Sequence, residues 1–365
     1  METCTENFQR VIVNYWQPNT AIYRYTSFLS EISPSTLINV VDDRTKWEDA
    51  HLGIDFYGKF SKSFLNVMFP KYSHHDLVNY LKRIDKNYTI FHYTSQRDIK
   101  LNEGNKTFFT VHDNPFSLFE TDLYLNGTAS RAQKLHREFA KFLFNHNCLN
   151  SQYIITDTDY VRNSLIKYGY KGYIETIRIP VANVFRKLNE SKEKLRMELN
   201  LPPNKILLLS ISNNVIRKNL KLTKELSKKI GKEYRIVRVG EGIENSINFS
   251  NIDDVTLNKL YNASDVLLFP SLEEGQGLPI SEAFSTGLPV VASDIPVLRE
   301  VAKDAAIYID PLDINSYCNG IKEALNISDL LIEKGFVKSK KYSFDIFKGK
   351  MNGLYRRIIR DGINS

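Results

Sequence analysis

Cysteine is scarce in this chain, with three in 365 residues. Cys4, Cys148 and Cys318 lie far apart and form no CxxC pair or Cys/His cluster, which excludes a disulfide framework and favours a reducing compartment. No apolar run approaches the roughly 18 residues that a membrane-spanning helix needs. The first ten residues, METCTENFQR, lack the apolar core of a signal peptide. We therefore expect a soluble, intracellular protein.

The signatures of two further protein classes are missing from the sequence. No group of His, Cys and Asp residues has the spacing of metal ligands. No ribonucleoprotein, zinc-finger or helix-turn-helix motif supports nucleic-acid binding. The net charge of +7 suits anionic partners such as nucleotide phosphates, acidic lipid surfaces or nucleic acid, but the excess is spread along the chain and does not choose among them.

Apolar runs predict two series of alternating strands and helices, and the length suffices for two domains. In the N-terminal half we expect strands at 10–15, 38–41, 89–93, 108–112 and 153–156, and helices at 21–32 and 160–168. After a connector at 180–186 we expect helices at 190–199, 220–230, 255–262 and 279–286, and strands at 205–210, 235–239, 266–269 and 289–292. Such alternation is typical of parallel sheets, whose ligands gather at the carboxyl ends of the strands.

The most informative stretch runs from Asp265 to Asp310. It predicts a buried strand, a loop with Gly275 and Gly277, a helix that begins at Pro279, and a second buried strand. The first turn of a helix carries free N–H groups and the positive end of the helix dipole, so it attracts phosphate. Glycines let a ligand approach the backbone closely. A plain parallel-sheet connection without a ligand has the same outline.

Charged residues flank this loop and the corresponding edge of the sheet. Glu274 and Glu282 lie eight positions apart around the turn. A phosphate site alone has no use for them, whereas a sugar nucleotide offers hydroxyls to the carboxylates and phosphates to the amides. Arg217 and Lys218 follow the first strand of the second series and could neutralise a diphosphate, or form a solvated basic turn. His112 ends a strand of the first series, as a ligand-binding residue or as a satisfied core residue.

Two acidic pairs have a simpler explanation than metal binding. Asp157-Thr-Asp159 resembles the DxD of metal-dependent sugar transferases, but it lies between a strand and a helix. Asp and Thr serve there as N-cap and first-turn residues, so we expect capping. Asp42-Asp43 also follows a strand, where we expect a solvated turn.

Residues 58–75 and 134–147 are rich in Lys, His and aromatic or apolar side chains. Both stretches could dock on an acidic membrane surface. We favour an ordinary amphipathic helix that packs on the core. In the second stretch the apolar side is formed by Leu135, Phe139, Phe142 and Leu143.

Three segments together resemble glycosyltransferase family 4: FPSLEEGQGLPISEA at 269–283, GLPVVASD at 287–294, and Asp310-Pro311. Members of that family are retaining, nucleotide-sugar-dependent enzymes. The resemblance implies an α/β protein of the GT-B fold, with two Rossmann-like parallel-sheet domains facing a central cleft. Residues 1–183 would form the acceptor domain and 184–341 the donor domain. A C-terminal helix within 342–365 would cross back onto the acceptor domain.

The resemblance also implies roles for individual residues. Glu282 would hold the ribose hydroxyls, and Glu274 would contact the donor sugar. Arg217 and Lys218 would neutralise the diphosphate, while His112 would face the donor sugar from the opposite domain, making Glu274 and His112 the catalytic candidates. Further donor contacts would come from the backbone amides of Gly275, Gln276, Gly277 and Leu278.

The chain departs from the family pattern at three places. The loop at 16–22 contains no glycine, although the family usually has a glycine-rich loop after the first strand. Asn213 stands where an arginine is common, which leaves one fewer cation for the diphosphate. Gln276 replaces the usual aromatic residue between the loop glycines, so the donor contact there is altered.

The resulting hypothesis is a retaining glycosyltransferase that moves a hexose from a UDP-, GDP- or ADP-linked sugar to an acceptor hydroxyl without a metal ion or other cofactor. The acceptor could be a glycan, a lipid-linked sugar or a protein. We expect a cytoplasmic location, with peripheral contact at the inner membrane surface through 58–75 or 134–147 as an option. The alternatives are an epimerase or phosphorylase of the same fold, and a nucleic-acid-binding or inactive transferase-like protein. A glycoside hydrolase is disfavoured because a helix-terminus anion site does not serve a neutral glycoside.

Overall fold

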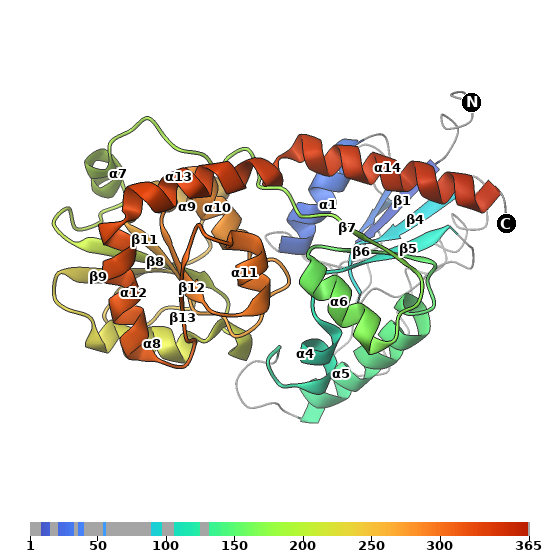
Figure 1. The fold of residues 1–365 in the computed structure, drawn as a ribbon, viewed down its shortest axis with the longest axis horizontal. Helices are drawn as coiled ribbons and strands as arrows, with labels where there is room; N and C mark the ends of the chain where they lie inside the picture. Colours follow the sequence, from blue (N-terminus) through green and yellow to red (C-terminus); the bar gives the residue numbers. More distant parts are fainter. Residues whose placement is uncertain are drawn as a thin grey trace.

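The structure is a computed structural model, and it describes residues 9–14, 21–32, 36–39, 54–55, 89–96, 106–124 and 131–363. The predicted loop at 16–22 is covered only at its last two residues, and Asp42-Asp43 and the stretch 58–75 lie outside the described residues. Two parallel sheets form two domains side by side (Figure 1). This confirms the predicted two-sheet α/β architecture.

The N-terminal sheet has the strand order β3-β2-β1-β4-β5-β6-β7, and its described pairings are parallel. Its strands are β1 (Gln9–Asn14), β2 (Thr36–Asn39), β3 (Ile54–Asp55), β4 (Thr89–Tyr93), β5 (Thr107–Val111), β6 (Tyr153–Thr156) and β7 (Tyr173–Thr176). Strand order reverses between β1 and β4, which leaves a crevice at the carboxyl ends of these strands where α/β proteins bind ligands.

The C-terminal sheet has the order β10-β9-β8-β11-β12-β13 and is also parallel in its pairings. Its strands are β8 (Ile206–Ser212), β9 (Tyr234–Gly240), β10 (Ser246–Phe249), β11 (Val266–Phe269), β12 (Val290–Ser293) and β13 (Ile307–Ile309). Here the order reverses between β8 and β11. The loops that follow these two strands carry the predicted cations and the predicted glycine loop.

Helices cover both sheets. They are α1 (Ala21–Ile32), α4 (Pro115–Glu120), α5 (Arg131–Leu143), α6 (Asp159–Tyr168), α7 (Lys192–Glu198), α8 (Leu220–Lys229), α9 (Asp254–Ala263), α10 (Leu278–Thr286), α11 (Pro296–Ala302), α12 (Ile314–Asn326), α13 (Ser328–Ser339) and α14 (Phe344–Ile363). Among the described helices none is both long and apolar enough to cross a membrane.

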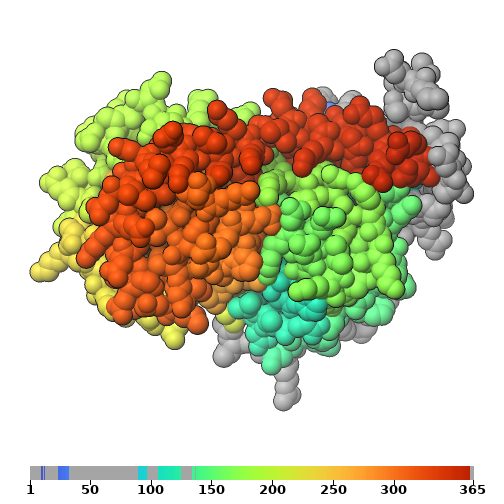
Figure 2. Space-filling model, in the orientation of Figure 1, coloured from blue at the N-terminus to red at the C-terminus, as the bar shows by residue number. Residues whose placement is uncertain are grey.

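The C-terminal helix belongs to the N-terminal domain in space. After α13, the chain passes along the top of both domains, and α14 lies on the N-terminal sheet (Figures 1 and 2). Phe347, Met351 and Ile358 of α14 are buried in the same core cluster as Ile12 and Tyr25. Each such side chain contributes about 1.5–3 kcal/mol on burial. The predicted return of the C-terminal helix is therefore confirmed, and it completes the N-terminal core.

Helix α5 packs through a different face from the one predicted. Ala140 is buried, and so is Phe144 in the π-helical turn that follows, whereas Leu135 and Phe142 are 52% and 61% exposed. The prediction of an amphipathic helix on the core is right, but its apolar stripe was misplaced. The buried positions Ala140, Phe144 and Cys148 recur every four residues, one position along the chain from the predicted Phe139 and Leu143, which are partly buried.

Candidate active site

The predicted glycine loop connects β11 to α10. The helix begins at Leu278, one residue earlier than expected, and ends before Gly287 as predicted. Gly277 caps it with φ of +79°, a left-handed conformation that side chains disfavour. This glycine is therefore required by the turn itself.

Gly275 is required for a different reason. A Cβ built on it would lie 1.8 Å from the main-chain oxygen of His112, which belongs to the other domain. The hydroxyl of Thr158 also donates to the carbonyl oxygen of Gly275 at 2.8 Å. The sequence predicts that a ligand lies against this glycine. In this structure the backbone of the N-terminal domain lies there instead.

Glu274 forms a buried ion triad with the two predicted cations. Its Oε1 accepts from Lys218 Nζ at 2.5 Å and its Oε2 from Arg217 Nη1 at 2.8 Å. Burial by itself raises the pKa of a carboxyl, but the charges of Lys218 and Arg217 outweigh burial and lower the Glu274 pKa to about 2. The structure thus brings together three residues that the sequence placed on two separate loops, at the switch point of the sheet.

The pKa values of the two cations are shifted in opposite directions, so Arg217 holds its proton more strongly than Lys218. Burial and the charge of Arg217 lower the pKa of Lys218 to about 8. For Arg217, burial is outweighed by Glu274 and the pKa is raised. The Arg217 guanidinium lies 4.7 Å from the centre of the Tyr124 ring, and its main-chain N–H donates to Leu123 of the N-terminal domain. Lys218 is therefore the cation whose charge most depends on an anion nearby.

Glu282 lies in the first turns of α10 and is engaged by the opposite domain. Arg24 of α1 donates to its Oε1 at 2.7 Å and to Asp254 at 2.7 Å, and Tyr261 donates to its Oε2 at 2.6 Å. Burial raises the pKa of Glu282. Both carboxylate oxygens are occupied, so a ribose could reach them only by displacing these donors.

Gln276 and Leu278 face the connection between the domains. The side-chain amide of Gln276 accepts from the main-chain N–H of Ile179 at 2.8 Å and donates to the Ile179 carbonyl at 3.0 Å. Leu278 packs against the core of the N-terminal domain. The side chain of Gln276 is thus committed to the interdomain connection rather than directed toward a donor.

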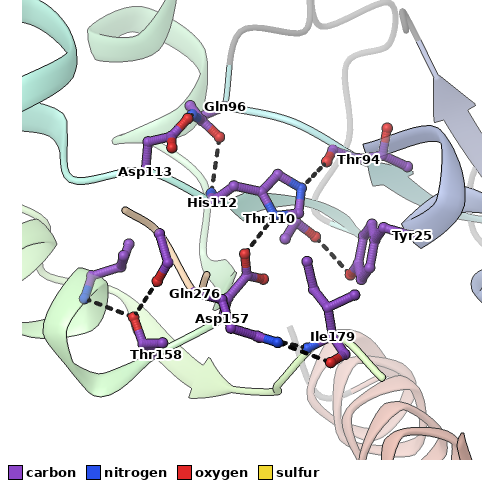
Figure 3. A network of polar contacts seen from close by, with 12 residues as sticks. Tyr25, Thr94, Gln96, Thr110, His112, Asp113, Asp157, Thr158, Ile179 and Gln276 are labelled. Atoms are coloured by element: carbon purple, nitrogen blue, oxygen red, sulfur yellow. Dashed lines mark hydrogen bonds and ion pairs between the residues drawn. The ribbon is translucent and has the colours of Figure 1, made fainter. Parts of the chain in front are cut away.

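His112 lies between two acceptors (Figure 3). Its Nδ1 is 2.7 Å from Asp157 Oδ2, and its Nε2 is 2.7 Å from the main-chain oxygen of Thr94. The main-chain N–H of His112 donates to Gln96. The capping expectation for the DxD-like segment is half right: Thr158 is the N-cap of α6 and Asp159 lies in its first turn, but Asp157 binds His112.

Glu273 also joins the domains. Its Oε2 accepts from Ser117 at 3.0 Å and Tyr160 at 3.1 Å. Burial raises the pKa of Glu273 to about 7, with only partial offset from these donors. On the neighbouring helix α11, Glu300 accepts from the main-chain N–H groups of Asp159 and Tyr160. These contacts close the cleft between the two domains.

The site contains residues that the sequence did not single out, namely Arg24, Thr94, Tyr261 and Glu273, and it contains Asp157, for which only a capping role was expected. Arg24 lies one turn into the first helix of an α/β domain, and Asp157 ends a strand at the ligand edge, so position alone offered a weak signal for both. Within the described residues no cluster of three His, Cys, Asp or Glu side chains could hold a metal ion.

Comparison with known proteins gives a family match for part of the chain and a fold for nearly all of it. Residues 191–334, less than half of the chain, match the family model "Glycosyl transferases group 1". The O-antigen chain mannosyltransferase RfbU of Salmonella typhimurium is 35% identical over 101 residues, which cover 27% of this chain and 28% of that protein. The match thus spans well under two thirds of that relative.

Solved structures resemble the chain over almost its whole length. Sucrose-phosphate synthase of Thermosynechococcus elongatus superposes with a TM-score of 0.76 at 14% identity, covering 97% of this chain and 100% of that one. Anabaena HepE, in complex with UDP-glucose, gives 0.71 at 12% identity, with 96% and 99% covered. The protein therefore has the GT-B fold, and residues 191–334 of its C-terminal domain match the group 1 glycosyltransferase model.

Proposed function

We propose that this protein is a retaining glycosyltransferase that moves a hexose from a nucleoside-diphosphate sugar to an acceptor hydroxyl. The observation that carries the proposal is the buried triad of Glu274, Arg217 and Lys218 beside the N-terminus of α10, at the switch point between β8 and β11. Two buried cations next to a helix N-terminus suit a diphosphate. The carboxylates supply the acceptors that sugar hydroxyls require.

In the proposed reaction the bond from the sugar C1 to the phosphate oxygen breaks, and both electrons stay on the phosphate. C1 bonds to the acceptor oxygen, and the hydroxyl proton passes to the departing phosphate. Arg217, Lys218 and the α10 amides would stabilise the charge that builds on the leaving group, where preorganised donors lower the barrier most. These groups can balance the diphosphate without a metal ion, and Glu282 would bind the ribose.

The donor must first open the cleft. Arg24 occupies Glu282, and the backbone of His112 lies against Gly275. We therefore expect donor binding to part the two domains and to exchange these internal contacts for contacts with the nucleotide.

The direct test is a thermal-shift panel of UDP, GDP, ADP and their sugar conjugates, with mannose conjugates included because RfbU is named a mannosyltransferase. A ligand at about 100 times its dissociation constant stabilises the folded protein by about 2.7 kcal/mol. Nucleotides that stabilise the protein would next be assayed for sugar transfer to glycan acceptors. No shift with any nucleotide would overturn the proposal, and product formed without an acceptor would indicate an epimerase or hydrolytic activity instead.

Donor affinity should fall as the pH rises above about 8. Lys218 must be protonated to bind a diphosphate, and its pKa in the free protein is about 8, so affinity should be constant below that pH and decline by up to about tenfold per unit above it. Calorimetric titration of the nucleoside diphosphate from pH 6.5 to 9.5 measures this. In the matched variant Lys218→Arg the charge persists, and the decline should disappear. An equal decline in both proteins would show that another group titrates.

The acceptor, the membrane contact and the cytoplasmic location stay predictions. The exposed side chains of Leu135 and Phe142 on α5 are compatible with a peripheral surface contact, and a lipid-linked glycan would be the acceptor class to test first, given the O-antigen role in the name of the Salmonella relative.

A further inference from the structure

The ring of His112 has no free nitrogen. The main-chain oxygen of Thr94 can only accept, so Nε2, at 2.7 Å from it, carries a hydrogen. Nδ1 lies 2.7 Å from a carboxylate oxygen of Asp157, which is 2% exposed. Figure 3 shows both contacts of the ring. When Asp157 is ionised, Nδ1 also carries a hydrogen, and the ring is an imidazolium.

Burial raises the pKa of Asp157, and the charges of His112 and Arg178 offset this only in part, so the ionic form rests on the contacts at the two ring nitrogens. The negative charge of Asp113, on the loop after β5, raises the pKa of both His112 and Asp157. The positive charge of Arg178, on the segment after β7, lowers the pKa of Asp157 and so stabilises its ionised form. Tyr25 of α1 presents its ring at 5.1 Å, edge to face, and His92 of β4 is the remaining basic neighbour. Burial lowers the pKa of His112, but Asp157 outweighs burial and raises it to about 9.

The histidine on the neighbouring strand provides an internal comparison. His92 is as buried as His112, but its ring nitrogens meet the hydroxyls of Thr110 and Tyr355 rather than a carboxylate. Burial lowers the pKa of His92 well below its ordinary value, with a further contribution from His112. The pKa values of these two buried histidines are therefore shifted in opposite directions, and the carboxylate of Asp157 accounts for the rise at His112.

Asp157 is costly to the fold. Its Oδ1 is buried and makes no hydrogen bond within the described part of the chain. A buried acceptor without a hydrogen bond destabilises the fold, because no partner replaces the water it has lost. Stability of the fold therefore does not explain this carboxylate, whereas a role in the charge of His112 does.

We propose that Asp157 is a positioning residue for the transfer. Asp157 keeps His112 as an imidazolium and holds it beside the glycine loop, where Gly275 contacts the main chain of His112. The proposal rests on the proposed function. In this state Asp157 and Thr94 hold both ring N–H groups, so His112 acts on a ligand through its positive charge. It has no lone pair with which to take the proton of the acceptor hydroxyl, so it is not the general base.

The pH dependence of transfer distinguishes this role from a merely structural one. At saturating donor, the wild-type rate should stay constant through neutral pH and fall above about pH 9, as His112 loses its proton. In Asp157→Asn the carboxylate charge is absent, and the pKa of His112 should drop to its ordinary value of about 6.5 or below. The variant should lose at least about tenfold in rate at pH 7.5, and its rate should rise only as the pH is lowered to about 6 and below.

The charge state can be measured without any assay of activity. Nitrogen-15 NMR of the ring should show imidazolium for His112 at pH 7.5 in the wild type, neutral imidazole in Asp157→Asn, and imidazolium again in Asp157→Glu, which restores the charge. Asp159→Asn is the matched control, because Asp159 lies two residues after Asp157 but accepts from Thr176 at the end of β7. Its pH profile and spectrum should match the wild type.

Either of two results would overturn the proposal: a neutral His112 ring in the wild type at pH 7.5, or an unchanged pH profile in a folded Asp157→Asn. If that variant does not fold, two wild-type measurements test the proposal: the ring spectrum at pH 7.5 and the fall of the transfer rate above about pH 9. If the wild type transfers no sugar, the proposed function fails, whereas the spectrum still tests the charge of His112. The two failures are therefore distinguishable.

Discussion

Glu274→Gln should reduce sugar transfer by at least about 1,000-fold and also destabilise the fold by about 3–5 kcal/mol. The catalytic loss is expected because removal of one preorganised electrostatic contact costs about 100- to 1,000-fold in rate, and here the two cations that face the diphosphate lose their anchor as well. The stability loss is expected because glutamine leaves Arg217 and Lys218 buried without an anion. Transfer assays at saturating donor and denaturant unfolding measure the two effects.

The burial of the triad is the reason why this substitution should affect the fold as well as transfer. Glu273→Gln is the matched control, because the pKa of Glu273 is raised to about 7 by burial, so at pH 6 the native side chain is largely uncharged already. Its unfolding free energy at pH 6 should be close to that of the wild type. Transfer by Glu274→Gln above a tenth of the wild-type rate would remove Glu274 from the active site.

The pH dependence of stability gives a second check on Glu274. Its folded pKa of about 2 lies below the ordinary value of 4.5, so its contribution is complete above about pH 4.5 and is lost as the pH falls toward 2. The difference in stability between wild type and Glu274→Gln should therefore be largest near neutral pH and shrink between pH 4.5 and 2. A difference that stays constant over this window would show that packing, rather than the ion triad, is responsible.

Arg24→Ala should lower the melting temperature of the ligand-free protein and yet tighten the binding of a nucleoside by about tenfold, or 1.4 kcal/mol. Arg24 ties α1 to Glu282 across the cleft, so its removal weakens the closed form and leaves a buried carboxylate with Tyr261 as its remaining side-chain partner. In the variant the ribose no longer has to displace the guanidinium from Glu282, so the binding free energy of the nucleoside becomes more favourable. Thermal unfolding and calorimetry with nucleosides and nucleoside diphosphates measure both effects.

Asp254→Asn provides the control for this pair. This substitution removes the other carboxylate that binds Arg24. The side chain of Asp254 is 44% exposed, and an exposed ion pair contributes about 1 kcal/mol or less to stability. Nucleoside affinity should then stay near the wild-type value. Weaker binding of nucleosides to Arg24→Ala would mean that Arg24 contacts the ribose directly. Weaker binding of nucleoside diphosphates alone would mean that Arg24 leaves Glu282 and binds the phosphates.

The sequence by itself determined the parts of this protein that depend on neighbouring residues. Buried apolar runs separated by helical patterns require parallel strands, and strand β11, Gly277, α10 and Gly287 were placed within a residue or two of their observed positions. Alternation of strands and helices also brings Arg217, Lys218 and Glu274 to one edge, because the carboxyl ends of parallel strands all lie there. The short edge strands β7, β10 and β13 were not predicted, since their apolar runs are brief and their positions depend on the strand beside them.

Only the tertiary structure decided which charges meet. Arg24 and Glu282 are 258 residues apart in the chain, and His112 and Asp157 are 45 apart, so no local pattern links either pair. Asp157 has the sequence context of a helix cap and becomes the partner of a histidine because β5 and β6 lie side by side in the sheet. The charge of His112 follows from that neighbour and from burial, and both are properties of the folded molecule.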